Sequence, residues 1–276
     1  MSLFKKIAIV GTGLIGGSIA LIVKKNNLAQ TVVGFSRHKE TIARALKSGI
    51  IDEGSQDLSI IKGADFVILA TPVAVILDLA PRIAKIISKD TIVTDVGSTK
   101  KEIVAKLDKI FENFIGSHPL AGSEKRGVVN AKTQIFQGSL CVLTPTKKSK
   151  RAIVKKVKKF WEATGAKTAM LDSDKHDEIL GFVSHLPHAV AFSLMVAVPK
   201  EHLKFAASGL RDSTRIATSD AEVWSEIFLS NQKNLLKCIG DFEKNIRKLK
   251  SAIKRKDKKA INSILAQANK KREFLK

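Results

Sequence analysis

The chain has 276 residues, of which 44% are hydrophobic, so it can bury one large core or two modest ones. Its apolar runs fall short of the roughly 18 residues of a membrane span, and no apolar leader precedes the first predicted strand. We therefore expect a cytoplasmic protein with no membrane contact. The two cysteines, Cys141 and Cys238, lie far apart in sequence without a metal-like spacing, so the pattern indicates neither a disulfide framework nor a zinc site and predicts two buried thiols.

The formal net charge is +22, a value that invites comparison with nucleic-acid-binding proteins. The lysine-rich stretch 244–276, however, has isoleucine and leucine between its cations at helical spacing, as on a pair of amphipathic helices with a solvated face. It lacks the series of interleaved aromatic side chains on which bases stack. We therefore expect no nucleic-acid partner, although a basic field would attract anionic small molecules.

The first predicted strand, residues 7–10, runs into a Gly-x-Gly-x-x-Gly turn at 11–16 and then a helix-like stretch at 18–23. A second strand, 31–35, arrives about twenty residues later, as a dinucleotide-binding βαβ unit requires. In such a unit the first glycine makes the turn, the second lets phosphate approach the backbone and the third lets helix and strand pack closely. We expect the pyrophosphate to contact Gly11, Gly13, Leu14, Ile15 and Gly16.

The second strand ends at Ser36-Arg37-His38-Lys39, where NAD-binding proteins normally carry an acidic residue on the ribose diol. A cationic, hydroxyl-bearing turn without a carboxylate suits a 2′-phosphate, so we predict that Ser36 and Arg37 favour NADP. The alternative is that Arg37 is one of many solvated cations and that the cofactor is NAD.

Further short apolar runs alternate with amphipathic stretches as far as residue 171. This alternation predicts an α/β Rossmann-type doubly wound parallel sheet, its strands buried on both faces. The predicted strands are 66–69, 91–94, 114–115, 140–143 and 167–170, with helices such as 73–87 and 149–163 between them.

Beyond residue 171 every periodic stretch is helical, which predicts two domains, 1–172 for the dinucleotide and 173–276 as an all-α domain. The apolar stripes of its helices are wider than one compact layer needs, so we expect a dimerisation domain and a homodimer. The predicted helices are 174–184, 187–198, 200–208, 222–250 and 257–276.

Polar residues follow three of the predicted strands, where a Rossmann fold forms its ligand crevice. Thr71 and Pro72 follow the strand at 66–69 and are expected to contact the cofactor. His118 lies past the strand at 114–115 in a loop rich in glycine and proline, and its ordinary pKa near 6.5 suits a general base. The alternative is a loop histidine that binds a backbone carbonyl. Asp95 is expected to bond nearby backbone.

Two more polar clusters lie in the helical half. His185 and His188 are about one helical turn apart, but no carboxylate or thiol cluster supports a metal, so we expect hydrogen bonds to substrate or across the domain seam. Arg211 and Arg215, at i and i+4, form a cationic face suited to a substrate carboxylate. The chain contains no tyrosine, which excludes the short-chain dehydrogenases because their proton donor is a tyrosine.

Five motifs in this order resemble the prephenate/arogenate dehydrogenases of tyrosine biosynthesis. They are Gly11 to Ser18, Asp95 to Lys100, His118-Pro119-Leu120-Ala121-Gly122-Ser123-Glu124, Ser184-His185-Leu186-Pro187-His188 and Gly209 to Ala217. The resemblance implies NAD(P)-dependent oxidative decarboxylation of prephenate, arogenate or both, with hydride leaving C4 of the substrate ring.

The same resemblance implies a role for each matching residue. His118 would accept the proton of the C4 hydroxyl, which Ser98 would hydrogen-bond, and Arg215 would bind the ring carboxylate. His188 and Ser123 would line the pocket and Glu124 would lie near its mouth. Trp224 falls where the family contributes an aromatic across the dimer seam, although a core tryptophan is the alternative.

Two other functions remain open at this stage. A β-hydroxyacid or imine reductase would share the domain plan, but its base at the seam would be a lysine or an acid. A non-catalytic NADP sensor or basic nucleic-acid binder would show no turnover. The motifs do not distinguish prephenate from arogenate, although Lys125 and Arg126 favour the more anionic prephenate.

Overall fold

The computed structural model describes residues 2–122 and 127–275. Its centre is an eight-stranded sheet in the order β3-β2-β1-β4-β5-β6-β7-β8, which confirms the predicted fold class. The strands are β1 (Phe4–Val10), β2 (Ala29–Phe35), β3 (Glu53–Ser55), β4 (Phe66–Leu69), β5 (Ile92–Asp95), β6 (Phe114–Pro119), β7 (Leu140–Thr144) and β8 (Lys167–Met170).

The expectation of an entirely parallel sheet is wrong at one place, because β6 and β7 pair antiparallel. A parallel return needs a crossover, usually a helix. Within the described residues between these strands the structure has only the 3₁₀ turn Val128–Asn130, so the chain comes back in the opposite direction. β8, parallel to β7, also departs from prediction in being partly exposed along its length.

Helices cover both faces of the sheet because alternate residues of β1 point to opposite sides. Ile7 and Ile9 pack with α1 (Leu14–Lys25) and α5 (Arg151–Ala163) in one buried cluster. Ala8 and Val10 belong to the cluster on the other face. That second face carries α3 (Val73–Ala84) and α4 (Lys101–Ile110), while α2 (Lys39–Lys47) lies beside β3.

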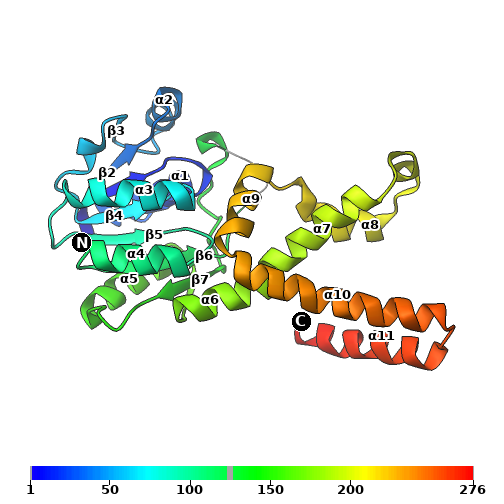
Figure 1. Ribbon diagram of the computed structural model, residues 1–276. Coiled ribbons are helices and arrows are strands. Elements are labelled where there is room, and N and C mark those ends of the chain that lie inside the picture. The colour runs from blue at the N-terminus through cyan, green and yellow to red at the C-terminus, as the bar shows by residue number, and fades with distance from the viewer. Residues whose placement is uncertain (1, 123–126, 276) are drawn as a thin grey trace.

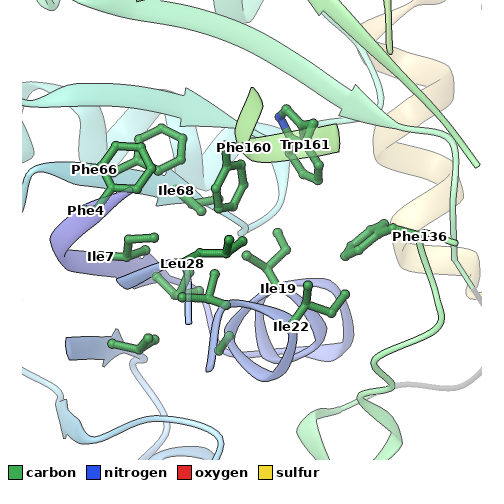
Figure 2. Packing of buried hydrophobic residues seen from close by; sticks show 14 of the residues in the cluster. Phe4, Ile7, Ile19, Ile22, Leu28, Phe66, Ile68, Phe136, Phe160 and Trp161 are labelled. Atoms are coloured by element: carbon green, nitrogen blue, oxygen red, sulfur yellow. The ribbon is translucent and has the colours of Figure 1, made fainter. Parts of the chain in front are cut away.

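Aromatic rings fill the first of these clusters (Figure 2). Phe4 stacks on Phe66 with ring centroids 4.7 Å apart, and Phe160 meets Phe66 edge-on at 4.9 Å. Trp161 of α5 is fully buried beside them. These large side chains pack α5 against one face of the sheet, near the amino ends of β1 and β4.

The chain after β8 is helical and extends away from the sheet, ending in the antiparallel pair α10 and α11 (Figure 1). Its elements are α6 (Ser173–Leu180), a π-helical turn (Gly181–His185), α7 (Leu186–Ala197), a 3₁₀ turn (Lys200–Phe205), α8 (Ser208–Thr214), a 3₁₀ turn (Arg215–Thr218), α9 (Ala221–Ser230), α10 (Gln232–Lys254), α11 (Lys258–Arg272) and a last 3₁₀ turn (Glu273–Leu275).

Two predicted helices differ from the structure. The stretch 200–208 is mostly a 3₁₀ turn, and the predicted helix 222–250 is divided at Asn231, whose backbone leaves helical geometry. Asn231 is buried, and its side-chain amide donates to the carbonyl oxygen of Asp177 at 2.8 Å. A tertiary hydrogen bond therefore interrupts a sequence that is helical by its local pattern.

One helical run, residues 173–197, is long and apolar enough to cross a membrane by length and composition, with a mean hydropathy of 1.6 in its best window. This corrects the expectation that no run approaches that length. A helix that packs against other protein passes the same test, so the property alone is weak evidence for a membrane.

Candidate active site

The glycine turn after β1 has the geometry that the sequence predicts. Gly11 has φ +101°, and a Cβ there would lie 2.6 Å from the carbonyl oxygen of Ala70. A Cβ on Gly16 would lie 2.0 Å from the carbonyl oxygen of Gly11, so only glycine allows α1 to start this close to β1. Nothing lies within 4 Å of a Cβ at Gly13, so the backbone there faces open space.

That open space belongs to a cavity of about 330 Å³ between the turn, the ends of β4 and β5, and α9. The side-chain hydroxyls of Thr12, in the turn, and Thr71, which lines the cavity, are buried and have no hydrogen-bond partner among the described residues. A bound pyrophosphate and nicotinamide would supply such partners, so the residues fit a dinucleotide. Among the predicted cofactor residues, the cavity is lined by Gly13, Leu14, Ile15, Thr71 and Pro72.

The predicted adenosine-side residues lie at the end of β2. Ser36 is buried, and its hydroxyl accepts the backbone N–H of His38 at 3.2 Å. Arg37 is exposed, and its carbonyl accepts the side-chain amide of Gln56 at 2.7 Å, which holds the turn in place. Arg37 and Pro72 together line a neighbouring cavity of about 780 Å³.

A larger cavity, of about 900 Å³, lies at the seam between the sheet and the helices. The structure brings five of the predicted catalytic and substrate residues to it: Ser98, His118, His188, Arg215 and Trp224. Because Ser98 and Trp224 also line the cavity beside the glycine turn, the two cavities adjoin. A substrate in the larger cavity would therefore lie next to a dinucleotide in the smaller one.

His118 lies within β6 itself, opposite Val142 of β7, and not in a loop as predicted. Its ring Nδ1 is 2.9 Å from Nε2 of His176, a residue of α6. Burial lowers the pKa of His118 well below its usual value, and the neighbouring charges of His176, Lys100 and His185 act in the same direction. His118 is therefore a neutral imidazole at neutral pH, the form that accepts a proton.

Asp95 and Lys100 form an ion pair beneath this site in which both side chains are fully buried. Lys100 Nζ also donates to the carbonyl oxygen of Ser117 at 2.9 Å, and Asp95 accepts the backbone N–H groups of Gly97 and Ser117. Asp95 thus bonds nearby backbone, as predicted. Since Lys100 is engaged in this way and does not line the larger cavity, it is a poor candidate for the base that a reductase would need.

The two predicted histidines of the second cluster both line the larger cavity, His185 from the end of the π-helical turn and His188 from the first turn of α7. His185 is buried and lies 3.0 Å from the side-chain nitrogen of Asn231. His188 Nδ1 donates to the carbonyl oxygen of Ser184 at 3.0 Å, and its ring stacks on Trp224. Trp224 thus lines the cavity of its own chain, whereas the resemblance implied an aromatic from across a dimer seam.

One predicted substrate residue, Arg211, is not brought to this cavity. Arg211 is exposed on α8 and does not line the larger cavity, because α8 ends at Thr214 and Arg215 begins a 3₁₀ turn. The expected i, i+4 cationic face is therefore not formed. Ser123 and Glu124, with Lys125 and Arg126, lie outside the described residues.

Sequence reasoning missed the residues behind His118. His176, Asp177 and Asn231 are buried and hydrogen-bonded at the seam, but they belong to no motif and lie far from His118 in the chain. A His-Asp pair at the start of a predicted helix was the only signal, and a charge-rich first turn is common on solvated helices. Within the described residues, no group of three or more His, Cys, Asp or Glu side chains could hold a metal ion.

Two family models divide the chain between them. Residues 19–170 match the nucleotide-binding domain of prephenate dehydrogenase, and residues 172–267 match its dimerization domain. The chain belongs to the prephenate dehydrogenase family. The two matched ranges contain the residues named above that line the larger cavity, whereas the glycine turn at 11–16 precedes the first range.

Relatives of this family are similar over most of their length. A prephenate dehydrogenase from Bacillus subtilis is 36% identical over 91% of this chain and 71% of its own. The crystal structure of prephenate dehydrogenase from Aquifex aeolicus with hydroxyphenyl propionate and NAD⁺ is 36% identical, with a TM-score of 0.93 over 99% of this chain and 98% of that one. Arogenate dehydrogenase from Synechocystis is 30% identical, with a TM-score of 0.85 over 98% and 100%.

Proposed function

We propose that this chain catalyses the oxidative decarboxylation of prephenate with a nicotinamide dinucleotide. The observation that carries the proposal is that His118 and Arg215 line one cavity, which adjoins a glycine cradle suited to the dinucleotide. The Bacillus subtilis relative bears the name of this activity, and the Aquifex aeolicus structure holds NAD⁺ with a hydroxyphenyl compound.

The chain's residues align a ring that becomes aromatic when it loses hydride and carbon dioxide. His118 accepts the proton of the C4 hydroxyl, and the Ser98 hydroxyl hydrogen-bonds the same oxygen and holds it toward His118. When bound, the dinucleotide supplies the acceptor for the hydride from C4. Aromatisation provides the driving force, so the protein mainly has to position C4 and its hydroxyl.

Arg215 binds the ring carboxylate. A guanidinium offers a planar pair of donors that matches a carboxylate, which the single ammonium of lysine cannot reproduce. The positive charge of Arg215 lowers the pKa of His188, although less than the burial of that ring does. Arg215 and His188 therefore face the same space. The stacked rings of His188 and Trp224 form the wall against which the substrate ring lies.

For the cofactor we propose NADP, with NAD as the alternative. Support comes from the exposed Arg37 in a turn held by Gln56 and from the absence of a carboxylate in the sequence Ser36 to Lys39. The Aquifex aeolicus relative contains NAD⁺, so the alternative has a specific precedent. Arg37→Ala should weaken NADP binding and leave NAD binding almost unchanged, since only NADP carries the 2′-phosphate.

We also propose a homodimer assembled through residues 173–276, with residues 1–172 as the dinucleotide domain. The helical part exposes large apolar side chains, among them Val196 (87% exposed), Phe205 (77%) and Leu236 (60%), which a second subunit would cover. Its match to a dimerization domain agrees with this arrangement. A cytoplasmic location fits a biosynthetic enzyme that uses soluble substrates.

The experiment is an initial-rate assay in which prephenate and arogenate are each offered with NADP or NAD, and carbon dioxide release is followed. Turnover with prephenate and NADP is expected. Turnover with arogenate alone would correct the substrate, and a preference for NAD would correct the cofactor. No turnover with any pairing, from protein whose folding is confirmed by its thermal transition, would overturn the proposed activity.

A further inference from the structure

A buried chain of three side chains runs from the substrate cavity into α6. His118 Nδ1 lies 2.9 Å from His176 Nε2, and His176 Nδ1 lies 2.7 Å from Asp177 Oδ1. His176 is fully buried, Asp177 is 1% exposed and His118 is 8% exposed. Such short contacts between buried polar atoms require each donor to meet an acceptor.

The protonation of each atom follows from the carboxylate. Burial raises the pKa of Asp177, but hydrogen bonds from His176 and from the backbone N–H groups of Lys101 and Lys100 outweigh it and leave the pKa below its usual value. Asp177 is therefore ionised and can only accept, so His176 Nδ1 carries a proton. Burial lowers the pKa of His176, which keeps that ring neutral and leaves its Nε2 as an acceptor.

The next link fixes the tautomer of His118. Because His176 Nε2 accepts, His118 Nδ1 must donate. In neutral His118 the unprotonated nitrogen is then Nε2. This nitrogen makes no contact with His176, so it is the one available to the cavity that His118 lines. Resting on the proposed function, we propose that His176 and Asp177 are positioning residues that hold His118 in the Nδ1-protonated tautomer, with Nε2 as the atom that accepts the substrate proton.

Asp177 is anchored rigidly enough to set this orientation. Its two carboxylate oxygens accept the backbone N–H of Lys100 at 2.7 Å and of Lys101 at 3.0 Å, at the start of α4. Its carbonyl oxygen accepts the amide of Asn231 at 2.8 Å. Asp177 is therefore held by the start of α4 and by Asn231 between α9 and α10, and the His176 ring is held through its carboxylate.

The same chain stabilises the charge that forms during the reaction. When His118 Nε2 takes a proton, the ring becomes a cation in a buried site, where Lys100 and His185 disfavour positive charge. Asp95 neutralises Lys100, and Asp177 supplies a negative charge two hydrogen bonds away from His118. Cys141 on the facing strand β7 stays a neutral thiol, because burial raises its pKa. Asp177 is thus the anion that balances the His118 imidazolium through His176.

Two variants of His176 separate positioning from packing. His176→Leu removes both hydrogen bonds and should lower kcat roughly 10²-fold, whereas KM changes little. In His176→Gln the amide can accept from His118 and donate to Asp177, so it should keep kcat within roughly ten-fold of wild type. Glu178→Gln, a change at a half-buried residue of the same helix that does not line the cavity, is the control for general effects on α6.

Asp177→Asn tests the role of the negative charge through the pH dependence of kcat/KM, which would not change if Asp177 had only a structural role. The amide keeps one of the two oxygens that accept N–H groups and has almost the same shape, but the negative charge is lost, so the acid limb of the kcat/KM profile should move to lower pH. An unmoved limb with a stable fold, or His176→Leu with wild-type kcat, would overturn the proposal. Turnover absent in wild type would instead overturn the proposed function.

The tautomer can be observed without turnover. Nitrogen-15 NMR of histidine-labelled protein, assigned with His118→Asn, should show His118 with a protonated Nδ1 and an unprotonated Nε2 at neutral pH. In His176→Leu this preference should be reduced or lost, while His176→Gln should keep it. The opposite tautomer in wild type would overturn the proposal whatever the activity assays show.

Discussion

His188 and Trp224 stack face to face, with ring centroids 3.4 Å apart and ring planes 18° from parallel. The hydrogen bond from His188 to the carbonyl of Ser184 holds one ring, and Phe228, edge-on to Trp224 at 5.7 Å, supports the other. The pair joins α7 to α9 across the larger cavity. The flat wall that results suits a six-membered ring.

Replacing Trp224 with alanine should therefore weaken substrate binding more than chemistry. Loss of an aromatic contact of about 1.4 kcal/mol predicts a KM for prephenate that rises roughly ten-fold, with a smaller change in kcat. Steady-state kinetics measure both. Phe228→Ala is the matched control, because Phe228 contacts Trp224 without lining the cavity; an equal rise in KM there would assign the effect to loosened packing.

His118→Asn should lower kcat by roughly 10²- to 10⁴-fold, the usual contribution of a positioned base. In wild type the lowered pKa of His118 keeps its imidazole unprotonated as pH falls through 6.5. The kcat/KM profile should therefore hold at pH 6.5 and fall only at lower pH. His202→Asn, on an exposed turn, is the control, and an acid limb centred above pH 6.5 would contradict the assignment.

Arg215→Ala should raise KM for prephenate by roughly 10- to 100-fold, because a charge-assisted hydrogen bond to the carboxylate is lost. Arg215→Lys should recover only part of the affinity, since lysine keeps the charge but not the planar pair of donors. Isothermal titration with a substrate analogue lacking the ring carboxylate provides a second measurement. That analogue should bind wild type and Arg215→Ala equally. Arg247→Ala, which removes an exposed arginine of α10, controls for the loss of one positive charge.

The buried Asp95–Lys100 pair should matter more for stability than a similar pair at the surface. Lys100→Met leaves Asp95 as an unpaired buried charge and should reduce the free energy of unfolding by about 3–5 kcal/mol. Lys24→Met, which breaks the partly exposed pair with Asp52, should reduce it by less than about 1 kcal/mol. Urea denaturation measures the free energy of unfolding of both variants. Equal losses would show that burial does not determine the cost of breaking an ion pair.

Stability should also depend on pH through His185. Burial, together with the charges of His176 and His188, lowers its pKa to about 4, despite the opposing charge of Asp177. Between pH 6.5, the pKa of a histidine in the unfolded chain, and about pH 4, residue 185 is protonated in the unfolded state but not in the folded state. Its contribution to the free energy of unfolding is therefore complete above pH 6.5 and is lost as pH falls toward 4.

The contribution of this one histidine is at most about 1.4 kcal/mol per pH unit. His185→Gln should reduce the slope of unfolding free energy against pH by up to that amount, as measured by urea denaturation from pH 4 to 7. His202→Gln, the same substitution on an exposed turn, is the control for replacing a histidine. If His185→Gln does not alter the slope, His185 of the wild-type protein is protonated to the same extent in the folded and unfolded states.

The sequence by itself determined the dinucleotide cradle, because its constraints are local. A turn between one strand and one helix needs glycine at Gly11 and Gly16 whatever the rest of the chain does, and both positions lack room for a Cβ. The alternation of buried runs likewise determined a sheet covered by helices, since each strand must place apolar residues on both faces. The two predicted buried cysteines are also confirmed.

Only the tertiary structure decided what surrounds His118. His176 is 58 residues away in the chain, and no local pattern indicates which ring nitrogen it would meet. Asn231 divides a predicted helix because a distant carbonyl oxygen binds its side chain. The antiparallel direction of β7 against β6 likewise has no signal in the local sequence pattern. Propensity and periodicity report on neighbours along the chain, whereas the orientation of a buried base depends on hydrogen bonds that form only when the sheet and the helices pack together.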